Sequence, residues 1–461
     1  MAKPRTIYAC TECGAQAPKW MGRCSECGSW STLVEERVGG EAEAPRELLR
    51  PESGNKPIRL SEIDAGAAPR VSSGIAELDR VLGGGFVPGS VVLLAGEPGV
   101  GKSTLALQLA ASLPKGSRVL YVAGEESPEQ IRLRADRLPN FPDNLVVIPE
   151  TNVDAVAAPW KELDPSLVLV DSIQTVRTER IESAAGSVAQ VRESAALLSS
   201  AARTQGAALV LIGHVTKEGS IAGPRVLEHL VDVVLQFEGD RGHAFRLLRA
   251  HKNRFGSTRE VGVFSMGEDG LETVENPSEL FLAERNRGAP GSCIVPLVEG
   301  SRPMLVEIQA LVAPAGYGTA RRTPIGVDDG RLALLLAVLE RRAGVDLVSR
   351  DVYVNVVGGV RISEPGADLA LALALASSRL DIPLPEDVVA CGEVGLGGEI
   401  RRVPRTDLRV EEAARLGFGR VLLPQGAPEA KKPPGGVSVL AVKDLQSAVS
   451  WLRDRAPTPT S

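Results

Sequence analysis

The 461-residue sequence lacks long apolar runs, a secretion signal and a strong excess of charge of one sign. Its longest unbroken apolar stretches are eight residues long, at Leu332–Leu339 and Leu369–Ala376, whereas a membrane-spanning helix needs ~20. The N-terminal residues Met-Ala-Lys-Pro-Arg do not form the apolar segment of a signal peptide. We therefore expect a soluble, cytoplasmic protein with no membrane partner.

Neither sign of charge dominates, because 52 Lys and Arg side chains stand against 58 Asp and Glu, for a net charge of −6. This balance excludes a histone-like protein that coats nucleic acid by bulk charge. A local basic surface remains compatible with it.

Cysteine is scarce, with six in the chain, but four lie close together. They form two near-identical turns, Cys10-Thr-Glu-Cys13-Gly and Cys24-Ser-Glu-Cys27-Gly, separated by ten residues. Four thiolates on two such turns suit the tetrahedral coordination of Zn²⁺, so we predict a zinc site and not disulfides. A redox-active CxxC is the alternative, but it requires one pair inside a thioredoxin-like βαβ unit. Cys293 and Cys391 stand alone and are expected to be buried thiols.

Composition divides the chain into four segments. Residues 1–30 surround the clustered cysteines as a zinc finger, and residues 31–57 are charged and rich in glycine and proline, which is typical of a linker. Residues 58–275 and 276–461 each alternate short β-branched runs with helical stretches. The alternation predicts an α/β fold class: a zinc ribbon, a parallel-sheet core covered by helices, and a second α/β domain.

The expected strands of the first α/β domain are almost entirely apolar, as in parallel sheets buried on both faces. They lie at Val91–Ala95, Arg118–Ala123, Leu145–Ile148, Leu167–Asp171 and Ala208–His214. Helices are expected at Lys102–Leu113, Pro128–Leu138 and Val188–Gln205. In the second domain we expect strands at Val306–Val312, Val352–Val357 and, as its last element, Arg420–Leu423, with helices at Gly330–Ala343 and Asp368–Arg379.

A phosphate-binding motif follows the first of these strands. Residues Gly96-Glu97-Pro98-Gly99-Val100-Gly101-Lys102-Ser103 fit G-x-x-x-x-G-K-[ST], and Thr104 continues into the expected helix. The glycines let backbone N–H groups face a phosphate, the helix N-terminus adds its positive dipole, and Lys102 reaches the β- and γ-phosphate oxygens. Ser103 would bind Mg²⁺. A glycine-rich turn without a nucleotide leaves Lys102 unexplained, so we predict a site for ATP and Mg²⁺.

Three acids that follow later strands are candidates for the rest of the active site. Asp171 ends a buried strand, as the carboxylate on the metal side requires. Glu125 and Glu126 directly follow Val119–Ala123, which we expect beside the phosphate-loop strand, where a carboxylate can orient the attacking water. One of the two is the expected general base, and the sequence does not say which. A solvated acidic loop is the alternative.

Further motifs carry a family resemblance. Ser73-Gly-Ile-Ala-Glu-Leu-Asp79, Gly83-Gly-Gly85 and the phosphate loop resemble the entry to RecA-like ATPases of the RecA, KaiC and DnaB kind. With the cysteine turns, Gly213-His-Val-Thr-Lys-Glu-Gly219 and Lys252-Asn-Arg-Phe-Gly256, the chain resembles the RadA (Sms) family of bacterial DNA repair proteins. The resemblance implies a DNA-dependent, helicase-type ATPase that binds single-stranded and branched DNA as a homo-hexamer. It also implies branch migration and strand exchange with a RecA-type recombinase in double-strand-break repair.

The resemblance also suggests roles for particular side chains. Lys252, Asn253, Arg254, Phe255 and Gly256 match the KNRFG motif of the family. On an extended segment Lys252 and Arg254 would point the same way, and two cations that reach a neighbour's γ-phosphate would act as arginine fingers in trans. A charged surface strand is the alternative. His214 lies where a γ-phosphate sensor would sit, and a satisfied buried histidine is the ordinary alternative.

The loops after the fourth and fifth strands, Gln174–Gly186 and Val215–Arg225, are the expected DNA contacts because ligand loops follow the carboxyl ends of parallel strands. Their cations are Arg177, Arg180, Lys217 and Arg225. A six-fold ring would repeat each cation around its pore, so a chain of net charge −6 could still bind a phosphate backbone. No aromatic residue is interleaved in these loops, so base stacking is not expected there. Solvated loops are the alternative.

The last domain resembles the proteolytic domain of Lon at Ser363–Leu369 and Gly392–Glu399. On that pattern the serine nucleophile falls at Gly366 or Ala367 and the lysine base falls near Asp407, and none of these residues can do that chemistry. We therefore expect a proteolytically inactive domain retained for oligomerisation or DNA contact. An ATP-dependent peptidase is thus disfavoured, whereas a scaffold or kinase of the KaiC kind stays open beside the DNA motor.

Overall fold

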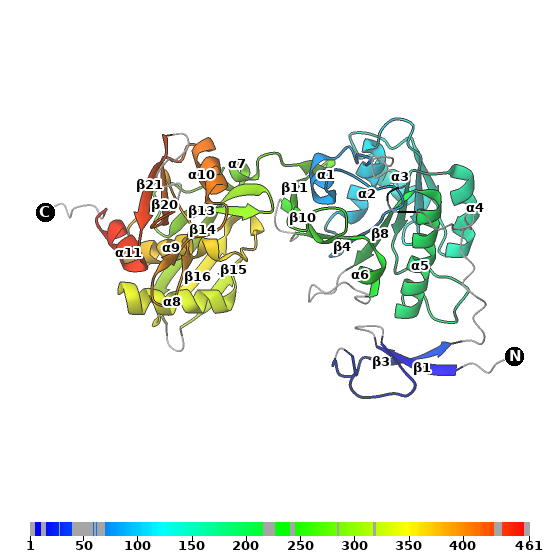
Figure 1. Cartoon of the computed structure of the whole chain (residues 1–461), viewed down its shortest axis with the longest axis horizontal. Coiled ribbons are helices and arrows are strands. Elements are labelled where there is room, and N and C mark those ends of the chain that lie inside the picture. Colours follow the sequence, from blue (N-terminus) through cyan, green and yellow to red (C-terminus); the bar gives the residue numbers. More distant parts are fainter. Residues whose placement is uncertain are drawn as a thin grey trace. The chain divides into compact units, whose positions relative to one another are not determined.

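The computed structural model describes residues 5–10, 15–26, 28–38, 59, 61, 70–214, 226–239, 245–283, 285–316, 320–427 and 436–455. The chain forms two compact units, Met1–Val274 and Glu275–Ser461 (Figure 1). The first holds a small N-terminal sheet and a large mixed sheet, and the second holds another mixed sheet of its own.

The N-terminal sheet has three antiparallel strands in the order β2-β1-β3, with β1 at Arg5–Cys10, β2 at Gln16–Ala17 and β3 at Leu33–Val38. Strand β3 pairs with β1 along its whole length. The predicted boundary at residue 30 is therefore wrong, because the charged residues around Glu35 form a strand of the ribbon and not the start of a linker. Residues 39–57 of the predicted linker lie outside the described residues.

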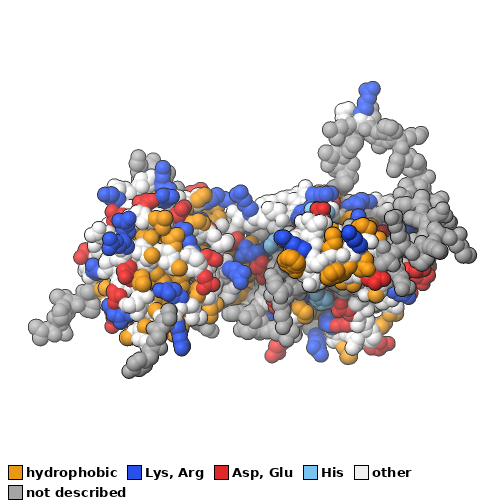
Figure 2. Space-filling view, turned by 90° about the horizontal axis from the view of Figure 1, so that it is seen from below, with side chains coloured by type: hydrophobic (Ala, Val, Ile, Leu, Met, Phe, Trp, Pro, Cys, Tyr) orange, Lys and Arg blue, Asp and Glu red, His pale blue; other side chains and the backbone are white. Residues whose placement is uncertain are grey.

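Charged side chains of both signs are interspersed over the face shown in Figure 2. No helix in the described part of the chain is long and apolar enough to cross a membrane. The described residues of that face thus show no single broad field of positive charge.

The large sheet of the first unit has nine strands in the order β12-β11-β10-β9-β4-β8-β7-β5-β6. All five predicted strands are present and pair in parallel: β4 (Val91–Gly96), β5 (Val119–Ala123), β6 (Leu145–Ile148), β7 (Leu167–Asp171) and β8 (Ala208–His214). The expectation that β5 lies beside the phosphate-loop strand β4 is wrong, because β8 and β7 lie between them. Crossover helices set this order, and the order of strands along the sequence does not reveal it.

The sheet continues beyond β4 with four strands that the sequence analysis did not anticipate. Strand β9 (Val233–Glu238) is parallel to β4. The next three strands each pair antiparallel with the strand before them: β10 (Phe245–Asn253), β11 (Val261–Gly267) and β12 (Gly270–Thr273). Short antiparallel connections need no crossover helix, so the βαβ alternation that identified the other strands is absent here.

Helices cover both faces of this sheet. Along β4, Val92 and Leu94 join a core with α1 (Ala76–Leu82) and α2 (Lys102–Ser112). Val91, Leu93 and Ala95 join the opposite core with α4 (Val153–Leu163) and α5 (Val188–Gln205). The alternation explains why the strands are apolar throughout: side chains on both faces are removed from water. Helix α3 (Pro128–Ala135) packs Ile131 into the first core, and α6 (Val226–Leu230) packs Leu227 into the second.

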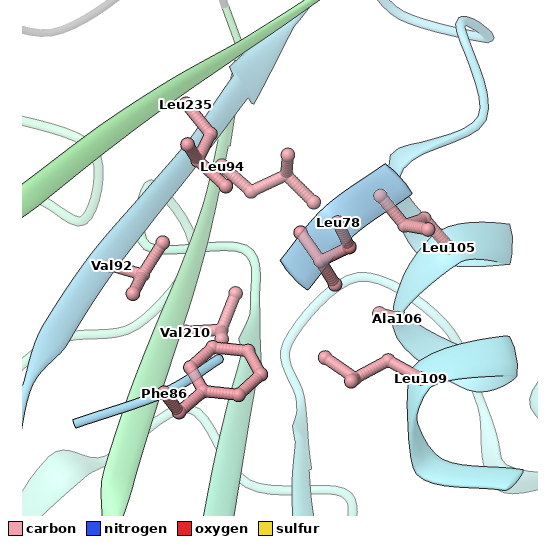
Figure 3. A pocket seen from close by; sticks show the side chains of 9 residues that line it. All are labelled: Leu78, Phe86, Val92, Leu94, Leu105, Ala106, Leu109, Val210 and Leu235. Atoms are coloured by element: carbon pink, nitrogen blue, oxygen red, sulfur yellow. The ribbon is translucent and has the colours of Figure 1, made fainter. Parts of the chain in front are cut away.

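A small apolar gap lies between α1, α2 and the sheet (Figure 3). Its volume is about 10 Å³, and side chains such as Leu78, Phe86 and Leu105 line it. A space of this size holds one water at most, and an apolar lining gives that water no partner. The gap is thus part of the core and not a ligand site.

The second unit has a seven-stranded sheet in the order β15-β16-β14-β13-β17-β20-β21. The strands are β13 (Ser292–Glu299), β14 (Arg302–Pro314), β15 (Arg322–Ile325), β16 (Arg350–Val356), β17 (Val388–Ala390), β20 (Arg420–Pro424) and β21 (Ser438–Val442). The helices are α7 (Pro277–Leu282), α8 (Asp329–Ala343), α9 (Asp368–Leu380), α10 (Thr406–Arg415) and α11 (Leu445–Arg453). The expectation that the domain ends at Arg420–Leu423 is wrong, because β21 pairs with β20 and α11 follows it.

An ion pair between the buried Arg409 and the partly exposed Glu364 lies beside the position that would hold the serine nucleophile of a Lon-type protease. A Cβ added at Gly366 would lie 3.4 Å from Glu364 Oε2 and 3.6 Å from Arg409 Nη1. Arg409 is 2% exposed and pairs with Glu364 through both of its terminal nitrogens. Neither a hydroxyl nor an amine occupies this position, and the ion pair instead joins the start of α9 to α10.

Candidate functional site

The phosphate loop connects β4 to α2 in the central sheet. Glycine is required at two of its positions. A Cβ at Gly96 would lie 2.6 Å from the carbonyl oxygen of Phe237, and one at Gly101 would lie 2.9 Å from Met266 Cε. Gly101 also has a φ of +115°, which side chains disfavour. The motif therefore fits a tight loop against β9 and β11.

The N-terminus of α2 has no side-chain cap and no acidic residue in its first turn. By contrast, Ser127, Asn152 and Ser187 cap α3, α4 and α5. The uncapped N–H groups and the positive end of the helix dipole stay available to an anion. The residues present therefore fit the phosphates of a nucleotide.

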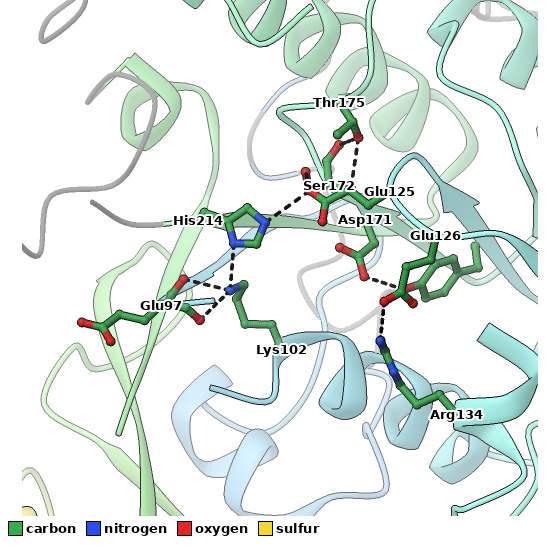
Figure 4. Close-up of polar contacts among 11 residues, drawn as sticks. Glu97, Lys102, Glu125, Glu126, Arg134, Asp171, Ser172, Thr175 and His214 are labelled. Carbon is green, nitrogen blue, oxygen red and sulfur yellow. Dashed lines mark hydrogen bonds and ion pairs between the residues drawn. The ribbon is translucent and has the colours of Figure 1, made fainter. Parts of the chain in front are cut away.

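Lys102 lies at the centre of the site and is 4% exposed (Figure 4). Its Nζ donates to the carbonyl oxygens of Gly96 at 2.8 Å and Glu97 at 3.0 Å, and lies 3.2 Å from His214 Nδ1. Burial lowers the pKa of Lys102, and the carboxylates of Asp171, Glu125 and Glu97 oppose that effect. The ammonium is thus held in the loop that it would use to bind phosphate.

His214 links Lys102 to Glu125. Its Nδ1 faces the Lys102 ammonium, and its Nε2 lies 3.2 Å from Glu125 Oε1. An ammonium only donates and a carboxylate only accepts, so one tautomer serves both contacts: Nδ1 accepts and Nε2–H donates. His214 is the last residue of β8 and is partly exposed, so it is not the fully buried histidine of the alternative interpretation.

The two candidate bases differ in their surroundings. Glu125 accepts hydrogen bonds from His214 and from the Ser172 hydroxyl, and the His214 contact is the largest of the effects that lower its pKa. Glu126 instead forms an ion pair with Arg134 on α3. Glu125 is therefore the carboxylate that lies nearer to Lys102 in this network, although its strand is not adjacent to β4.

Asp171 ends β7 and is buried. The Tyr121 hydroxyl, from the neighbouring strand β5, donates to Asp171 Oδ2 at 2.6 Å. Burial raises the pKa of Tyr121 well above its ordinary value, and the Asp171 carboxylate raises it further. Tyr121 keeps one carboxylate oxygen fixed, and Oδ1 accepts no hydrogen bond within the described residues. A carboxylate so arranged, together with the Ser103 hydroxyl, fits Mg²⁺.

Sequence reasoning missed Tyr121, Ser172 and Arg134. Tyr121 and Ser172 contact side chains about fifty residues away, whereas Arg134 contacts Glu126 eight residues away. In isolation each resembles an ordinary strand, loop or helix residue. The adjacency of β5 and β7 is the signal that would have indicated Tyr121, and only the structure supplies it.

Three residues of the KNRFG motif fasten it to α1. Asn253 Nδ2 donates to the carbonyl oxygens of Val81 at 3.1 Å and Leu82 at 3.3 Å. Phe255 packs against the core that α1 shares with the sheet. Gly256 approaches the turn at Gly83, where an added Cβ would lie 3.4 Å from its Cα. The motif thus closes the C-terminus of α1.

The two cations of the motif have different partners within the chain. The Lys252 ammonium donates to the carbonyl oxygens of Glu228 at 2.5 Å and Val231 at 2.7 Å, at the end of α6. Arg254 pairs with Asp232 at 3.2 Å, and its side chain is 55% exposed. Burial and the nearby Arg254 lower the pKa of Lys252. We expected the side chains of Lys252 and Arg254 to point the same way, as on a regular strand. The two residues do not lie on one regular strand, because the register shifts just before Lys252, and β10 ends before Arg254.

The four cations predicted to contact DNA are only partly described. Arg177 is exposed, whereas Arg180 pairs with Asp154 of α4 at 2.8 Å. Lys217 and Arg225 lie outside the described residues. Both described residues are exposed, and the charge of Arg180 is partly neutralised by its carboxylate partner.

Cys10 and Cys24 share the core of the N-terminal ribbon. Each begins a turn with the same backbone hydrogen bond, from Cys10 N to Ala15 O and from Cys24 N to Ser29 O, both at 2.9 Å. Two equivalent turns that bring buried thiols to one core fit a zinc-binding knuckle pair. Cys13 and Cys27 lie outside the described residues.

Comparison with protein families and known proteins agrees with these sites. Residues 57–220 match the family described as AAA domain, and residues 8–35 match the one described as rubredoxin metal binding domain. The first match covers the phosphate loop, Glu125, Asp171 and His214, and supports a nucleotide site that hydrolyses ATP. The second covers all four clustered cysteines and supports Zn²⁺ binding.

The chain is similar along its length to proteins named DNA repair protein RadA. It is 50% identical to the one from Halalkalibacterium halodurans, over 97% of this chain and 99% of that protein. It is 47% identical to the one from Escherichia coli, over 98% of this chain and 100% of that protein. Among solved structures, the RadB recombinase matches with a TM-score of 0.37 and 26% identity, over 44% of this chain and 100% of that one.

We predict one tightly held Zn²⁺ per chain, measurable by elemental analysis of protein purified without chelator. Cys10→Ala should lose the metal and unfold the ribbon, because a unit this small depends on its metal for stability. The thermal unfolding of the nucleotide-binding sheet should be unchanged. Cys293→Ala removes a thiol of the second unit and should keep the zinc. Full zinc content in Cys10→Ala would contradict the ligand assignment.

Tyr121→Phe removes the hydroxyl that fixes Asp171 while keeping the ring. We expect the Mg²⁺ concentration for half-maximal ATP turnover to rise about ten-fold, as is typical when a partner of a metal ligand is lost. Titration of turnover with Mg²⁺ measures this shift. In an Asp171→Asn background, Tyr121→Phe should add no further effect. A lower melting temperature with unchanged Mg²⁺ dependence would assign Tyr121 a purely structural role.

Proposed function

The chain belongs to the RadA family of DNA repair proteins, and from this premise we propose that it is a DNA-dependent ATPase that processes recombination intermediates. In this proposal it binds single-stranded DNA and promotes branch migration and strand exchange with a RecA-type recombinase, in the cytoplasm. The observation that carries the proposal is the chain of contacts from Lys102 through His214 to Glu125. It joins the phosphate loop to the end of β8, which leads directly into residues 215–225.

We assign the hydrolytic roles as follows. Residues 96–104 bind the phosphates, Lys102 stabilises charge on the β- and γ-phosphates, and Glu125 orients the attacking water. Ser103 and Asp171 would hold Mg²⁺, which neutralises charge that develops on the phosphate oxygens when it is bound. Glu126 supports the site through its ion pair with Arg134.

His214 has the geometry of a sensor in this scheme. A γ-phosphate that binds Lys102 competes with the Nδ1 contact, which frees the ring of one of its two partners. A shift of His214 is transmitted to Glu125 and to the segment that follows β8. In this scheme DNA binds to Lys217 and Arg225 of that segment and to Arg177 and Arg180 of the loop after β7. Because coupling between two sites is reciprocal, bound DNA would in turn affect His214 and the nucleotide site.

We further propose that six copies form a ring in which Lys252 and Arg254 reach the nucleotide of a neighbour. The exposure of Arg254 supports this, because half of the side chain faces solvent. Lys252 would first have to leave the end of α6, to which it donates two hydrogen bonds. The free energy needed to break these two hydrogen bonds would be offset in the assembled ring by the new contacts of Lys252 with phosphate.

In the same proposal residues 276–461 form a Lon-like domain without peptidase activity that serves assembly or DNA contact. The absence of a hydroxyl at Gly366 and Ala367 supports this, as does the Glu364–Arg409 ion pair beside Gly366. Residues 39–57 would be the linker between the zinc ribbon and the ATPase core.

The central test compares ATP turnover with and without single-stranded DNA. We expect clear stimulation by DNA, and we expect Lys102→Ala to fall below about a tenth of wild-type turnover, because phosphate-loop cations matter by orders of magnitude. Lys115→Ala removes an exposed cation at the far end of α2 and is the control. Turnover indifferent to DNA would favour a scaffold or kinase, and digestion of casein would favour a peptidase.

Arg254→Ala tests the ring. It should bind ATP normally, because the phosphate loop lies in the same chain, but lose most DNA-stimulated turnover, since an arginine finger commonly contributes ~10³-fold or more. Mixing inactive Arg254→Ala with inactive Lys102→Ala should restore activity, because some sites then combine an intact Lys102 with an intact Arg254 of a neighbour. Arg259→Ala, which removes another exposed arginine, should stay active.

Two results would contradict this interface. Mixed rings that form without any recovery would mean that Arg254 acts within its own subunit or on DNA. Full turnover in Arg254→Ala alone would mean that the motif acts only through its contacts with α1 and α6 in its own chain.

A further inference from the structure

The zinc ribbon exposes two tryptophans. Trp20 is 57% exposed and Trp30 is 71% exposed, whereas the other two tryptophans of the chain are less accessible: Trp160 is fully buried and Trp451 is partly buried. Exposure of two large rings on so small a unit is costly in water and indicates a binding surface.

Both indoles come close to Gly22. A Cβ placed at Gly22 would be 3.8 Å from Trp20 Cη2 and 3.8 Å from Trp30 Cζ3. These two ring atoms are therefore no farther apart than twice that distance. A planar group stacked between two rings needs a separation of about 7–8 Å, or two contacts of roughly 3.5–4 Å, which lies at the upper end of this bound. Because Gly22 has no side chain, the space beside the two indoles stays open, and we call this space the slot.

Cations flank the slot. The Arg23 guanidinium lies over the Trp30 ring at 5.7 Å and donates to the carbonyl oxygen of Gly28 through Nε, and the residue is exposed. Lys19 is exposed next to Trp20. Against these two cations, Glu26 is the exposed carboxylate of the same stretch, residues 15–26. Stacking rings beside cations fit the bases and phosphates of a single strand.

The surroundings favour a nucleic acid over a protein. Tryptophans that anchor protein interfaces are enclosed by further contacts that exclude water. Most residues that neighbour this pair in the chain are instead polar or charged and at least partly exposed, namely Lys19, Arg23, Ser25, Glu26, Ser29 and Ser31, and the apolar ones are Pro18 and Met21. A flat base can stack on such rings without an apolar rim, because every base has a π-face.

We infer that Trp20, Gly22 and Trp30 form a stacking slot for an unpaired base of single-stranded DNA, with Arg23 and Lys19 on the adjoining phosphates. The inference rests on the proposed function and adds to it a contact outside the ATPase loops, which hold no aromatic residue in Gln174–Gly186 and Val215–Arg225. According to this inference, the zinc ribbon helps to hold the DNA strand.

The test measures binding of full-length protein to a fluorescent thymidine homopolymer. Trp20→Ala and Trp30→Ala should each weaken affinity by about 5-fold to 100-fold, whereas Trp20→Phe should keep most of it. Gly22→Leu should block the slot with both tryptophans intact, and Gly22→Ala should be tolerated, because its Cβ meets ordinary contact distances without a positive φ. Leu133→Ala, which removes another exposed apolar side chain, is the matched control. Zinc content reports whether each variant keeps the ribbon folded.

The outcomes separate this inference from the proposed function. If wild-type protein binds the homopolymer and the tryptophan and Gly22→Leu variants bind it within two-fold, the slot is wrong while the proposed function stands. If those variants keep DNA binding but no longer bind a RecA-type recombinase in a binding assay, the surface binds a protein instead. If wild-type protein binds no single-stranded DNA, the proposed function fails and the slot fails with it.

Discussion

A buried ammonium organises the nucleotide site. Lys102 is removed from water at the carboxyl edge of the sheet, where the carbonyl oxygens of Gly96 and Glu97 and the imidazole of His214 satisfy it. Burial of a charge is tolerated only when its hydrogen bonds are replaced, so the loop must keep its shape around this group. The fixed tautomer of His214 follows from that requirement, and the close approaches of Gly96 to Phe237 and of Gly101 to Met266 keep the loop in place.

The KNRFG motif also depends on contacts within the ATPase core. Asn253, Phe255 and Gly256 attach it to α1, and Lys252 and Arg254 attach it to the end of α6 and the start of β9. Asp232 also accepts a hydrogen bond from the backbone of Val91, the first residue of the strand that leads into the phosphate loop. A motif that looks like an exposed charged strand in the sequence is thus a junction between three elements of the ATPase core.

Local patterns predicted local structure well. The strands from β4 to β8 were predicted because each is apolar on both faces, and the phosphate loop because its spacing reflects backbone geometry. Sheet order was not predictable, so β5 was wrongly placed beside β4. The choice between Glu125 and Glu126 depends on His214, Ser172 and Arg134, whose contacts arise only in the folded chain. Strand β3 was missed because its charged residues resemble a linker, although Leu33 packs into the ribbon core and the strand pairs with β1 along its whole length.

The uncapped start of α2 couples the stability of the ATPase core to its nucleotide. Its first N–H groups have no side-chain cap, and the buried Lys102 ammonium lies beside them, so bound phosphate adds hydrogen bonds that the folded chain alone does not make. A ligand that binds only the folded chain adds about 2.7 kcal/mol of stability when its concentration is about a hundred times its Kd. When cellular ATP falls, that contribution shrinks, and local opening near the loop exposes the chain to proteases. Energy depletion would then lower the amount of this protein as well as its turnover.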